Sequence, residues 1–202
     1  MPAVRRCVPN FPYRSIRRGF SLVELLVVTG IIGLLIAILL PTVIGVRVAG
    51  KRVACRAQLA DLGRTFQMFL NDSKNRLPAV NTMPSVIPLI NDAPSIVEIF
   101  KPYLKDSTRV FRCSADVIRV DSPDSPAGFE TYYEREGSSY QYNPFLASLY
   151  AGLQIKDTTL YEQGRQSQLP IMFDYEPFHA KTNTVGSTNY LFADMHVGDL
   201  VD

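Results

Sequence analysis

The sequence of 202 residues predicts an α+β protein, in which one long N-terminal helix packs on a small antiparallel β-sheet head. Three observations predict this fold class. Residues 20–46 hold 19 hydrophobic residues among 27 and one charge, Glu24. Residues 42–77 contain no proline and keep a helical spacing of apolar side chains. Beyond residue 105 the pattern changes to short aromatic or alternating runs, which favour strands.

The first nineteen residues form a basic leader. They carry five arginines and no acidic residue, whereas the whole chain has a formal charge of only +2. Removal of residues 1–19 leaves 16 basic against 19 acidic residues, a formal charge of −3. The remaining chain is therefore mildly acidic, and we expect no nucleic-acid contact, because nucleic-acid binders show a clear basic excess.

An uncharged segment of 22 residues, 25–46, follows the leader. This length is sufficient for a helix to cross a hydrocarbon core of roughly 30 Å. A secretory signal peptide would have a shorter apolar region of about 7–15 residues and a small-residue cleavage site after it. A plain signal anchor fits the length, but it does not explain the residues at the junction with the leader.

The junction reads Arg-Arg-Gly-Phe-Ser-Leu-Val-Glu-Leu over residues 17–25 and continues into the apolar segment. It resembles the cleavage and methylation site of type IV prepilins and type II secretion pseudopilins. The resemblance implies a pilin-like fold and cleavage after Gly19 by a prepilin peptidase on the cytoplasmic side. It also implies N-methylation of Phe20, with the N-terminus in the cytoplasm and the head in the periplasm or outside the cell.

Glu24 is the one carboxylate in the apolar segment. It lies four residues after Phe20, so a helix would place it on the same face as the new amino terminus. Carboxylates at the edge of a bilayer are usually paired. We therefore expect Glu24 to pair with the amino terminus of a neighbouring subunit and to set the register of assembly. The alternative is a carboxylate that is hydrated among the lipid headgroups.

The helix is expected to run from Phe20 to about Asn75, roughly 80 Å at 1.5 Å per residue. Residues 20–46 would form the transmembrane or filament-core part, and residues 47–76 the amphipathic continuation. Pro41 removes one helix hydrogen bond and is the expected kink. Either Pro41 and the nearby glycines are sites of bending, or they are residues that an ordinary transmembrane helix tolerates. The amphipathic stripe consists of Cys55, Leu59, Leu62, Phe66, Phe69 and Leu70.

Residues 77–202 form the predicted head. Four prolines between residues 78 and 94 predict an irregular loop, and Pro94-Ser95 opens a short helix to about Lys101 or Leu104. Residues 121–128 predict a surface loop. The predicted strands are Val110–Cys113, Phe129–Tyr133, Ser139–Tyr142, Pro170–Asp174, Tyr190–Ala193 and His196–Val201.

The head resembles a branch of bacterial pseudopilin-like proteins that end in an Asp-Gly-His-Val-type sequence. The matching stretches are residues 103–106, 110–116, 139–143 and 189–197. Two residues depart from the pattern, because Ser114 stands where the branch has proline and Met195 where it has glycine. A tight turn with φ > 0 at Met195 would be strained, so we expect the hairpin to differ from the family form.

Few residues of the head suggest chemistry. His179, Asp194 and His196 match no metalloenzyme spacing, and a hydrogen-bonded Asp–His pair in a hairpin is the favoured interpretation. We expect no catalytic residue, metal or cofactor; if calcium binds, its oxygen ligands would be Asp174, Asp194 and Asp199. Cys7 would be lost with the leader. Cys55 and Cys113 are either bridged or free, and the sequence does not decide between the two.

The favoured function is that of a structural subunit, not an enzyme. The resemblance implies a type II secretion or type IV pilus-like filament. The expected partners are a prepilin peptidase, other pilin-like subunits, an inner-membrane assembly platform and membrane lipid. The first alternative is a membrane-anchored module whose head binds a ligand outside the cytoplasm. The second is a tethered hydrolase that uses His179, Asp194 or His196.

Overall fold

A computed structural model describes residues 20–83, 93–105, 107–118, 129–182 and 184–200. The chain divides into two compact units, Met1–Ile44 and Gly45–Asp202, and each is described by itself. The predicted leader with Gly19, most of the proline-rich loop and the predicted loop at 121–128 lie outside the described residues.

The predicted long helix is confirmed as α1, which spans Leu22–Asp72 and contains Pro41 within its length. It ends three residues before the predicted end at about Asn75. Lys74 and Asn75 have φ values of 57° and 61°, and the Asn75 N–H donates to the Leu70 carbonyl at 2.7 Å. This is the bond of a Schellman motif, in which left-handed residues satisfy the last carbonyls of a helix.

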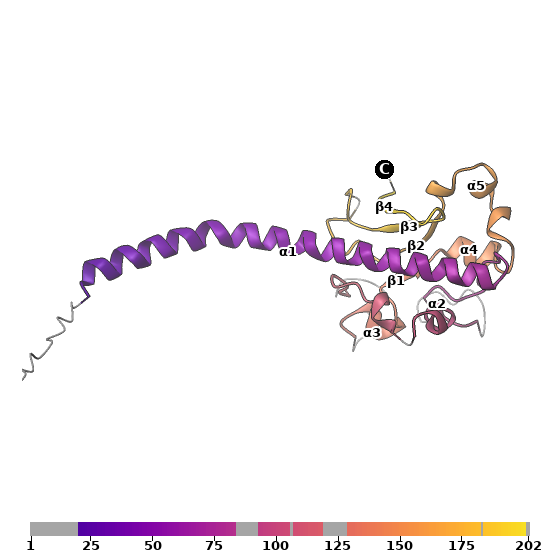
Figure 1. The fold of residues 1–202 in the computed structure, drawn as a ribbon, viewed down its shortest axis with the longest axis horizontal. Coiled ribbons are helices and arrows are strands. Elements are labelled where there is room, and N and C mark those ends of the chain that lie inside the picture. Colours follow the sequence, from indigo (N-terminus) through magenta and orange to yellow (C-terminus); the bar gives the residue numbers. More distant parts are fainter. Residues whose placement is uncertain (1–19, 84–92, 106, 119–128, 183, 201–202) are drawn as a thin grey trace, which may run out of the picture. The chain divides into compact units, whose positions relative to one another are not determined.

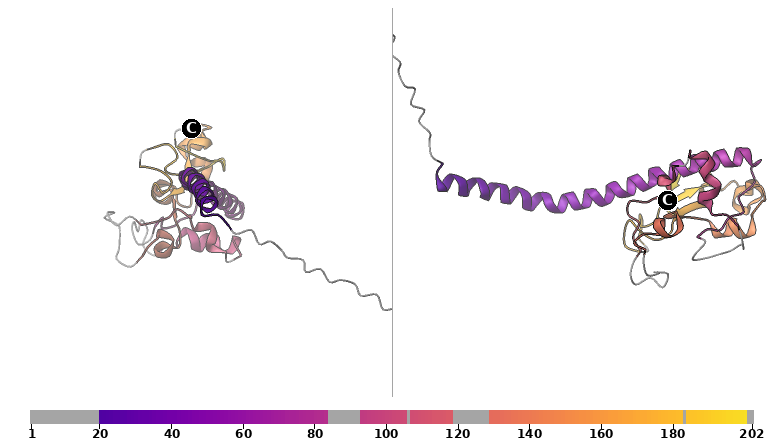
Figure 2. Two further views of the ribbon diagram at one scale, coloured as in Figure 1. Left: turned by 90° about the vertical axis from the view of Figure 1, so that its left-hand side faces the viewer. Right: turned by 90° about the horizontal axis from the view of Figure 1, so that it is seen from below.

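A four-stranded antiparallel sheet forms the second part of the head, with the strand order β1-β2-β3-β4. The strands are β1 (Tyr140–Tyr142), β2 (Pro170–Asp174), β3 (Tyr190–Phe192) and β4 (Val197–Gly198). Four of the six predicted strands are thus confirmed, although β4 is shorter than predicted. Figures 1 and 2 show the sheet and the short helices of the head gathered around the magenta second half of α1.

Two predicted strands were wrong. Val110–Cys113 falls mainly in the 3-10 helix η2 (Thr108–Phe111), and Phe129–Tyr133 runs into the helix α3 (Tyr132–Glu136). The Thr131 side chain caps α3 by accepting the Glu134 N–H. The Asp116 carboxylate accepts the first two backbone N–H groups of the helix, those of Tyr132 and Tyr133, at 3.1 and 2.9 Å. Aromatic content suggested strand, but these caps decide for helix.

The other helices of the head are short. The predicted helix after Ser95 is confirmed as α2 (Ile96–Phe100), with a Ser95–Glu98 capping box, and η1 (Lys101–Tyr103) continues it. The remaining ones were not predicted: α4 (Pro144–Leu149), η3 (Ile155–Asp157), α5 (Thr159–Glu162) and η4 (Gln166–Gln168).

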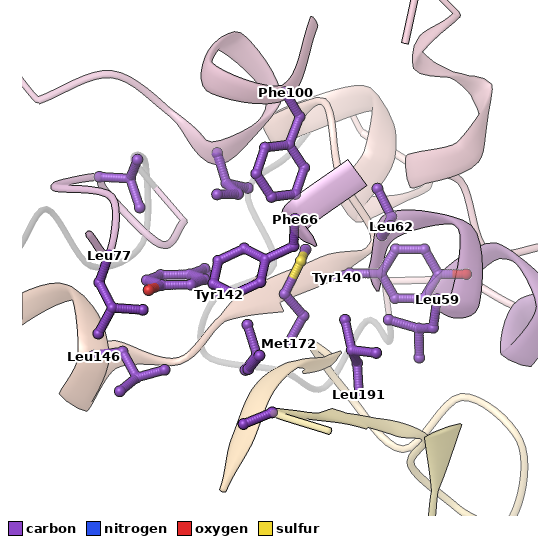
Figure 3. Close-up of a cluster of buried hydrophobic side chains, with 14 of the residues drawn as sticks. Leu59, Leu62, Phe66, Leu77, Phe100, Tyr140, Tyr142, Leu146, Met172 and Leu191 are labelled. Atoms are coloured by element: carbon purple, nitrogen blue, oxygen red, sulfur yellow. The ribbon is translucent and has the colours of Figure 1, made fainter. Parts of the chain in front are cut away.

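The predicted amphipathic stripe of α1 forms the centre of the core. Figure 3 shows Phe66 between Phe100 and Tyr142, and the ring centroids lie 6.1 and 6.3 Å from that of Phe66. Gly63 brings the helix close to the sheet, because a Cβ atom at this position would lie 2.9 Å from Leu191 Cδ1. Five further α1 residues are fully or almost fully buried: Cys55, Leu59, Leu62, Thr65 and Leu70.

The turn between β3 and β4 keeps a left-handed residue without glycine. Met195 has a φ of 69°, and its N–H donates to the Phe192 carbonyl at 2.8 Å. Such a conformation costs roughly 1–2 kcal/mol for an ordinary L-residue. The Met195 side chain packs against the core cluster, and this burial offsets the strain. The predicted strain is therefore present, while the turn itself retains the conformation that glycine usually provides.

Candidate functional site: the apolar half of α1 and a buried cystine

The first half of α1 exposes an unusual amount of apolar surface. Every described residue from Phe20 to Lys51 is exposed, and 18 large hydrophobic side chains lie among residues 20–46. Covering a half-exposed aliphatic side chain is worth about 1 kcal/mol, so this surface represents on the order of 20 kcal/mol. A soluble monomer does not leave such a surface in water. The segment must lie in lipid or against other chains, and α1 is long and apolar enough to cross a membrane.

Glu24 stands in the first turn of α1, where a carboxylate is stabilised by the helix dipole. Phe20 lies two residues before the helix, and the Ser21 carbonyl accepts the Leu25 N–H at 3.2 Å. Both Phe20 and Glu24 are exposed, and among the described residues no ion pair to Glu24 is present. The structure thus holds Phe20, which is the predicted first residue after cleavage, and the Glu24 carboxylate near one end of an apolar helix.

The glycines in the apolar half of α1 pack against no other part of the chain that the structure describes. A Cβ atom added at Gly30, Gly33 or Gly45 would meet nothing within 4 Å. Pro41 lies inside a helix that continues on both sides of it. The hydroxyls of Thr29 and Thr42 bond back to carbonyls three or four residues earlier, as they do in helices without access to water.

Residues 14–40 match the family model described as the prokaryotic N-terminal methylation motif. The chain is prepilin-like. The motif indicates a prepilin-peptidase substrate similar to type IV pilins and pseudopilins. The apolar helix that begins within the motif is long enough to anchor the chain in a membrane with a single span. No curated protein and no solved structure matches the chain. The resemblance of the head to the branch with the Asp-Gly-His-Val-type ending therefore stays a prediction.

The three carboxylates named as candidate calcium ligands have separate partners. Asp199 forms ion pairs with Arg52 and Arg56, at 2.6 and 3.6 Å. Asp174 is buried and accepts hydrogen bonds from the backbone N–H and the side-chain Nδ2–H of Asn189. The exposed Asp194 carboxylate lies 2.5 Å from Nδ1 of His196, so the predicted Asp–His pair is confirmed, in the turn before β4.

The prepilin-like head contains a disulfide between Cys55 of α1 and Cys113 after η2. The two Cα atoms are 5.2 Å apart, and both residues are almost completely buried. Of the two states that the sequence left open, the structure has the bridged one. The bond fixes the buried half of α1 to the segment that precedes α3.

His179, one of the candidate residues in the sequence, lies next to this disulfide, a position that the sequence did not indicate. His179 Nε2 lies 3.5 Å from Cys113 Sγ and 3.4 Å from Asp174 Oδ2. The side chains of His179 and Asp174 are completely buried. Burial lowers the pKa of His179 to about 4 and raises the pKa of Asp174 to about 7. The histidine is therefore neutral at pH 7. Cys55, Cys113 and His179 are the one group of potential metal ligands found among the described residues.

Asn189 connects this buried cluster to the surface of α1. Its side-chain carbonyl accepts Nε–H groups from Arg52 and Arg56, at 3.3 and 3.1 Å. Its backbone N–H and its side-chain Nδ2–H both donate to Asp174 Oδ2, at 2.7 and 2.8 Å. The two arginines are four residues apart on one helix face, which was a readable signal, but nothing in the sequence indicated their partners.

A hollow of about 390 Å³ lies beside β3, next to the segment that carries His179. Its lining is rich in hydroxyl groups and includes Thr182, Thr184, Ser187, Thr188 and Tyr190. The Asp199 carboxylate also reaches it but is held by the two arginines. The hollow is partly open to solvent, and the described residues that line it include no pair of a nucleophile and a base.

Proposed function

We propose that the chain is a pseudopilin-like structural subunit that assembles into a type II secretion or type IV pilus-like filament. The observation that carries the proposal is the exposed apolar surface of residues 20–46 directly behind a prepilin-type motif. In the membrane, lipid covers this surface. In a filament, the same surface of neighbouring subunits covers it, so one segment serves as anchor and as assembly core.

The proposed orientation has the leader in the cytoplasm and the head outside it. Five leader arginines precede the span and four basic residues follow it closely, namely Arg47, Lys51, Arg52 and Arg56, so the charge count alone favours a cytoplasmic leader only weakly. The resemblance of the junction to prepilins supports this orientation. The Cys55–Cys113 disulfide supports an external head, because disulfides persist in oxidising compartments such as the periplasm or the cell surface. Cleavage after Gly19 would then take place at the cytoplasmic face, and methylation would follow on Phe20.

Glu24 has the proposed role of pairing with the methylated amino terminus of a neighbouring subunit. The pairing would neutralise two charges within an apolar helix bundle, where an unpaired charge costs several kcal/mol. It would also fix the axial position of each added subunit. The further partners in this proposal are the prepilin peptidase and an inner-membrane assembly platform.

The test replaces Glu24 by Ala or by Gln and measures processing and assembly separately. We expect both variants to be cleaved and inserted in the membrane normally, but to be absent from the sheared filament fraction. Glu162→Ala removes an exposed carboxylate of the head and serves as the matched control, with normal filaments expected. Normal filaments from both Glu24 variants would contradict the pairing. A processed wild-type chain that stays monomeric in the membrane would instead support the membrane-anchored binding module.

A further inference from the structure

Three potential metal ligands from distant parts of the chain meet inside the head. Cys55 comes from α1, Cys113 from the end of η2, and His179 from the segment after β2. One ligand atom from each lies within 4.8 Å of the other two. Zinc–ligand distances of 2.0–2.3 Å place the ligand atoms of a tetrahedral site roughly 3.4–3.8 Å apart. Small side-chain adjustments would therefore bring the three atoms to metal-binding distances once the two sulfurs are separate.

A disulfide does not by itself account for the polar groups around it. His179 Nδ1 and Asp174 Oδ1 are both buried and have no hydrogen-bond partner among the described residues. Leaving a buried polar atom without a partner costs about 1–3 kcal/mol. His179 Nε2 faces Cys113 Sγ at 3.5 Å, and the Ala115 N–H points to the same sulfur at 3.4 Å. Such groups suit a metal thiolate, which accepts N–H bonds and takes histidine as a co-ligand.

We propose that Cys55, Cys113 and His179 bind one thiophilic divalent cation, such as Zn²⁺, when the Cys55–Cys113 disulfide is reduced. A dithiol or phosphine reductant supplies two electrons to break the S–S bond and is itself oxidised. The cation then displaces the protons of both thiols, and neutral His179 donates a ring-nitrogen lone pair. These three residues are the protein ligands of the site among the described residues, and the fourth position of a tetrahedral site is left to water. The head thus has two alternative cross-links at one place, a disulfide when oxidised and a metal when reduced.

This proposal does not depend on filament assembly, because all three ligand residues lie within the unit Gly45–Asp202. It can therefore fail while the proposed function holds, and the reverse is also true. The metal would fasten the same two segments that the disulfide fastens, and so keep α1 attached to the head in a reducing environment.

The test uses the full chain in detergent, with Cys7→Ser to remove the one cysteine outside the cluster. After reduction and removal of bound metals, Co²⁺ is added as the spectroscopic probe. We expect visible bands typical of tetrahedral cobalt and a near-ultraviolet sulfur-to-cobalt charge-transfer band, which saturate at one Co²⁺ per chain. Zn²⁺ should displace them. The oxidised protein should give neither band, and reduced protein without these bands overturns the proposal.

Three variants assign the ligands. Cys113→Ser and His179→Ala should lose the charge-transfer band or weaken Co²⁺ binding at least tenfold, while His196→Ala should bind as the parent does. His196 is the other histidine of the chain, and it is exposed. In case a variant folds poorly, the reaction of the reduced parent with a thiol reagent gives a second readout. Zn²⁺ should slow this reaction, and unchanged thiol reactivity contradicts the site.

Discussion

The disulfide between Cys55 and Cys113 makes a quantitative prediction about the head. It closes a loop with a sequence separation of 58 residues. In the loop-entropy model, a cross-link over this separation stabilises the folded state by about 4 kcal/mol. The replacement of both cysteines by alanine should therefore lower the free energy of unfolding by about 4 kcal/mol, plus a smaller loss of packing at two buried positions.

The assay is urea unfolding of the processed chain in mild detergent, followed by tyrosine circular dichroism in the near ultraviolet. With an m-value of about 2 kcal/mol per M, the loss appears as a midpoint shift of about 2 M. A phosphine reductant together with a chelator should shift the parent by a similar amount and leave the double variant unchanged. If the reductant leaves the parent midpoint unaltered, the disulfide does not stabilise the head and the reasoning is refuted.

Three further predictions concern the stability of the head. Tyr142→Phe should leave the free energy of unfolding unchanged or raise it by up to about 1 kcal/mol, because the buried Tyr142 hydroxyl has no partner among the described residues. Tyr140→Phe should lower the free energy of unfolding by about 1 kcal/mol, because the Tyr140 hydroxyl donates to Gln58 of α1 at 2.9 Å. Urea unfolding compares the two variants. Burial raises the pKa of both tyrosines, so above pH 10 the unfolded state releases protons that the native state keeps. The free energy of unfolding should therefore fall by about 1.4 kcal/mol per pH unit for each tyrosine. If Tyr142→Phe has the same dependence of stability on pH as the parent, this prediction is wrong. Gly63→Leu should lower the free energy of unfolding by about 1–3 kcal/mol, because the new side chain would overlap with Leu191. Gly45→Leu adds a side chain in open space and should not affect the stability of the head. Equal thermal midpoints for the two variants would contradict the close approach of α1 to the sheet at Gly63.

Local signals predicted much of the fold. The apolar spacing of α1, the helix start at Pro94-Ser95 and the short apolar run Pro170–Asp174 all specify their structures within a few residues. The helix α4 was missed although its signal was present, since Asn143 and Pro144 occupy the cap and first position of a helix. In these places the sequence contains the information that the structure uses.

Signals that depend on distant partners were not readable. The helix α3 has a local cap in Thr131, but its first two N–H groups donate to Asp116, which lies 16 residues before Tyr132. The aromatic residues of α3 suggested a strand instead. The pairing of the two cysteines and the position of His179 beside them depend on how α1 packs on the sheet. The junction at residues 17–25 was the opposite case, because a peptidase reads it as a short linear motif and the fold is not needed to recognise it.

If this prepilin-like chain is cut after Gly19 and works as a filament subunit from Phe20 onward, its mature form lacks the basic leader. Mass spectrometry of the N-terminal peptide, purified from the membranes of producing cells, measures this directly. We expect a mature chain that begins with N-methylated Phe20. An intact N-terminus at Met1, or a cut near Val46, would contradict it.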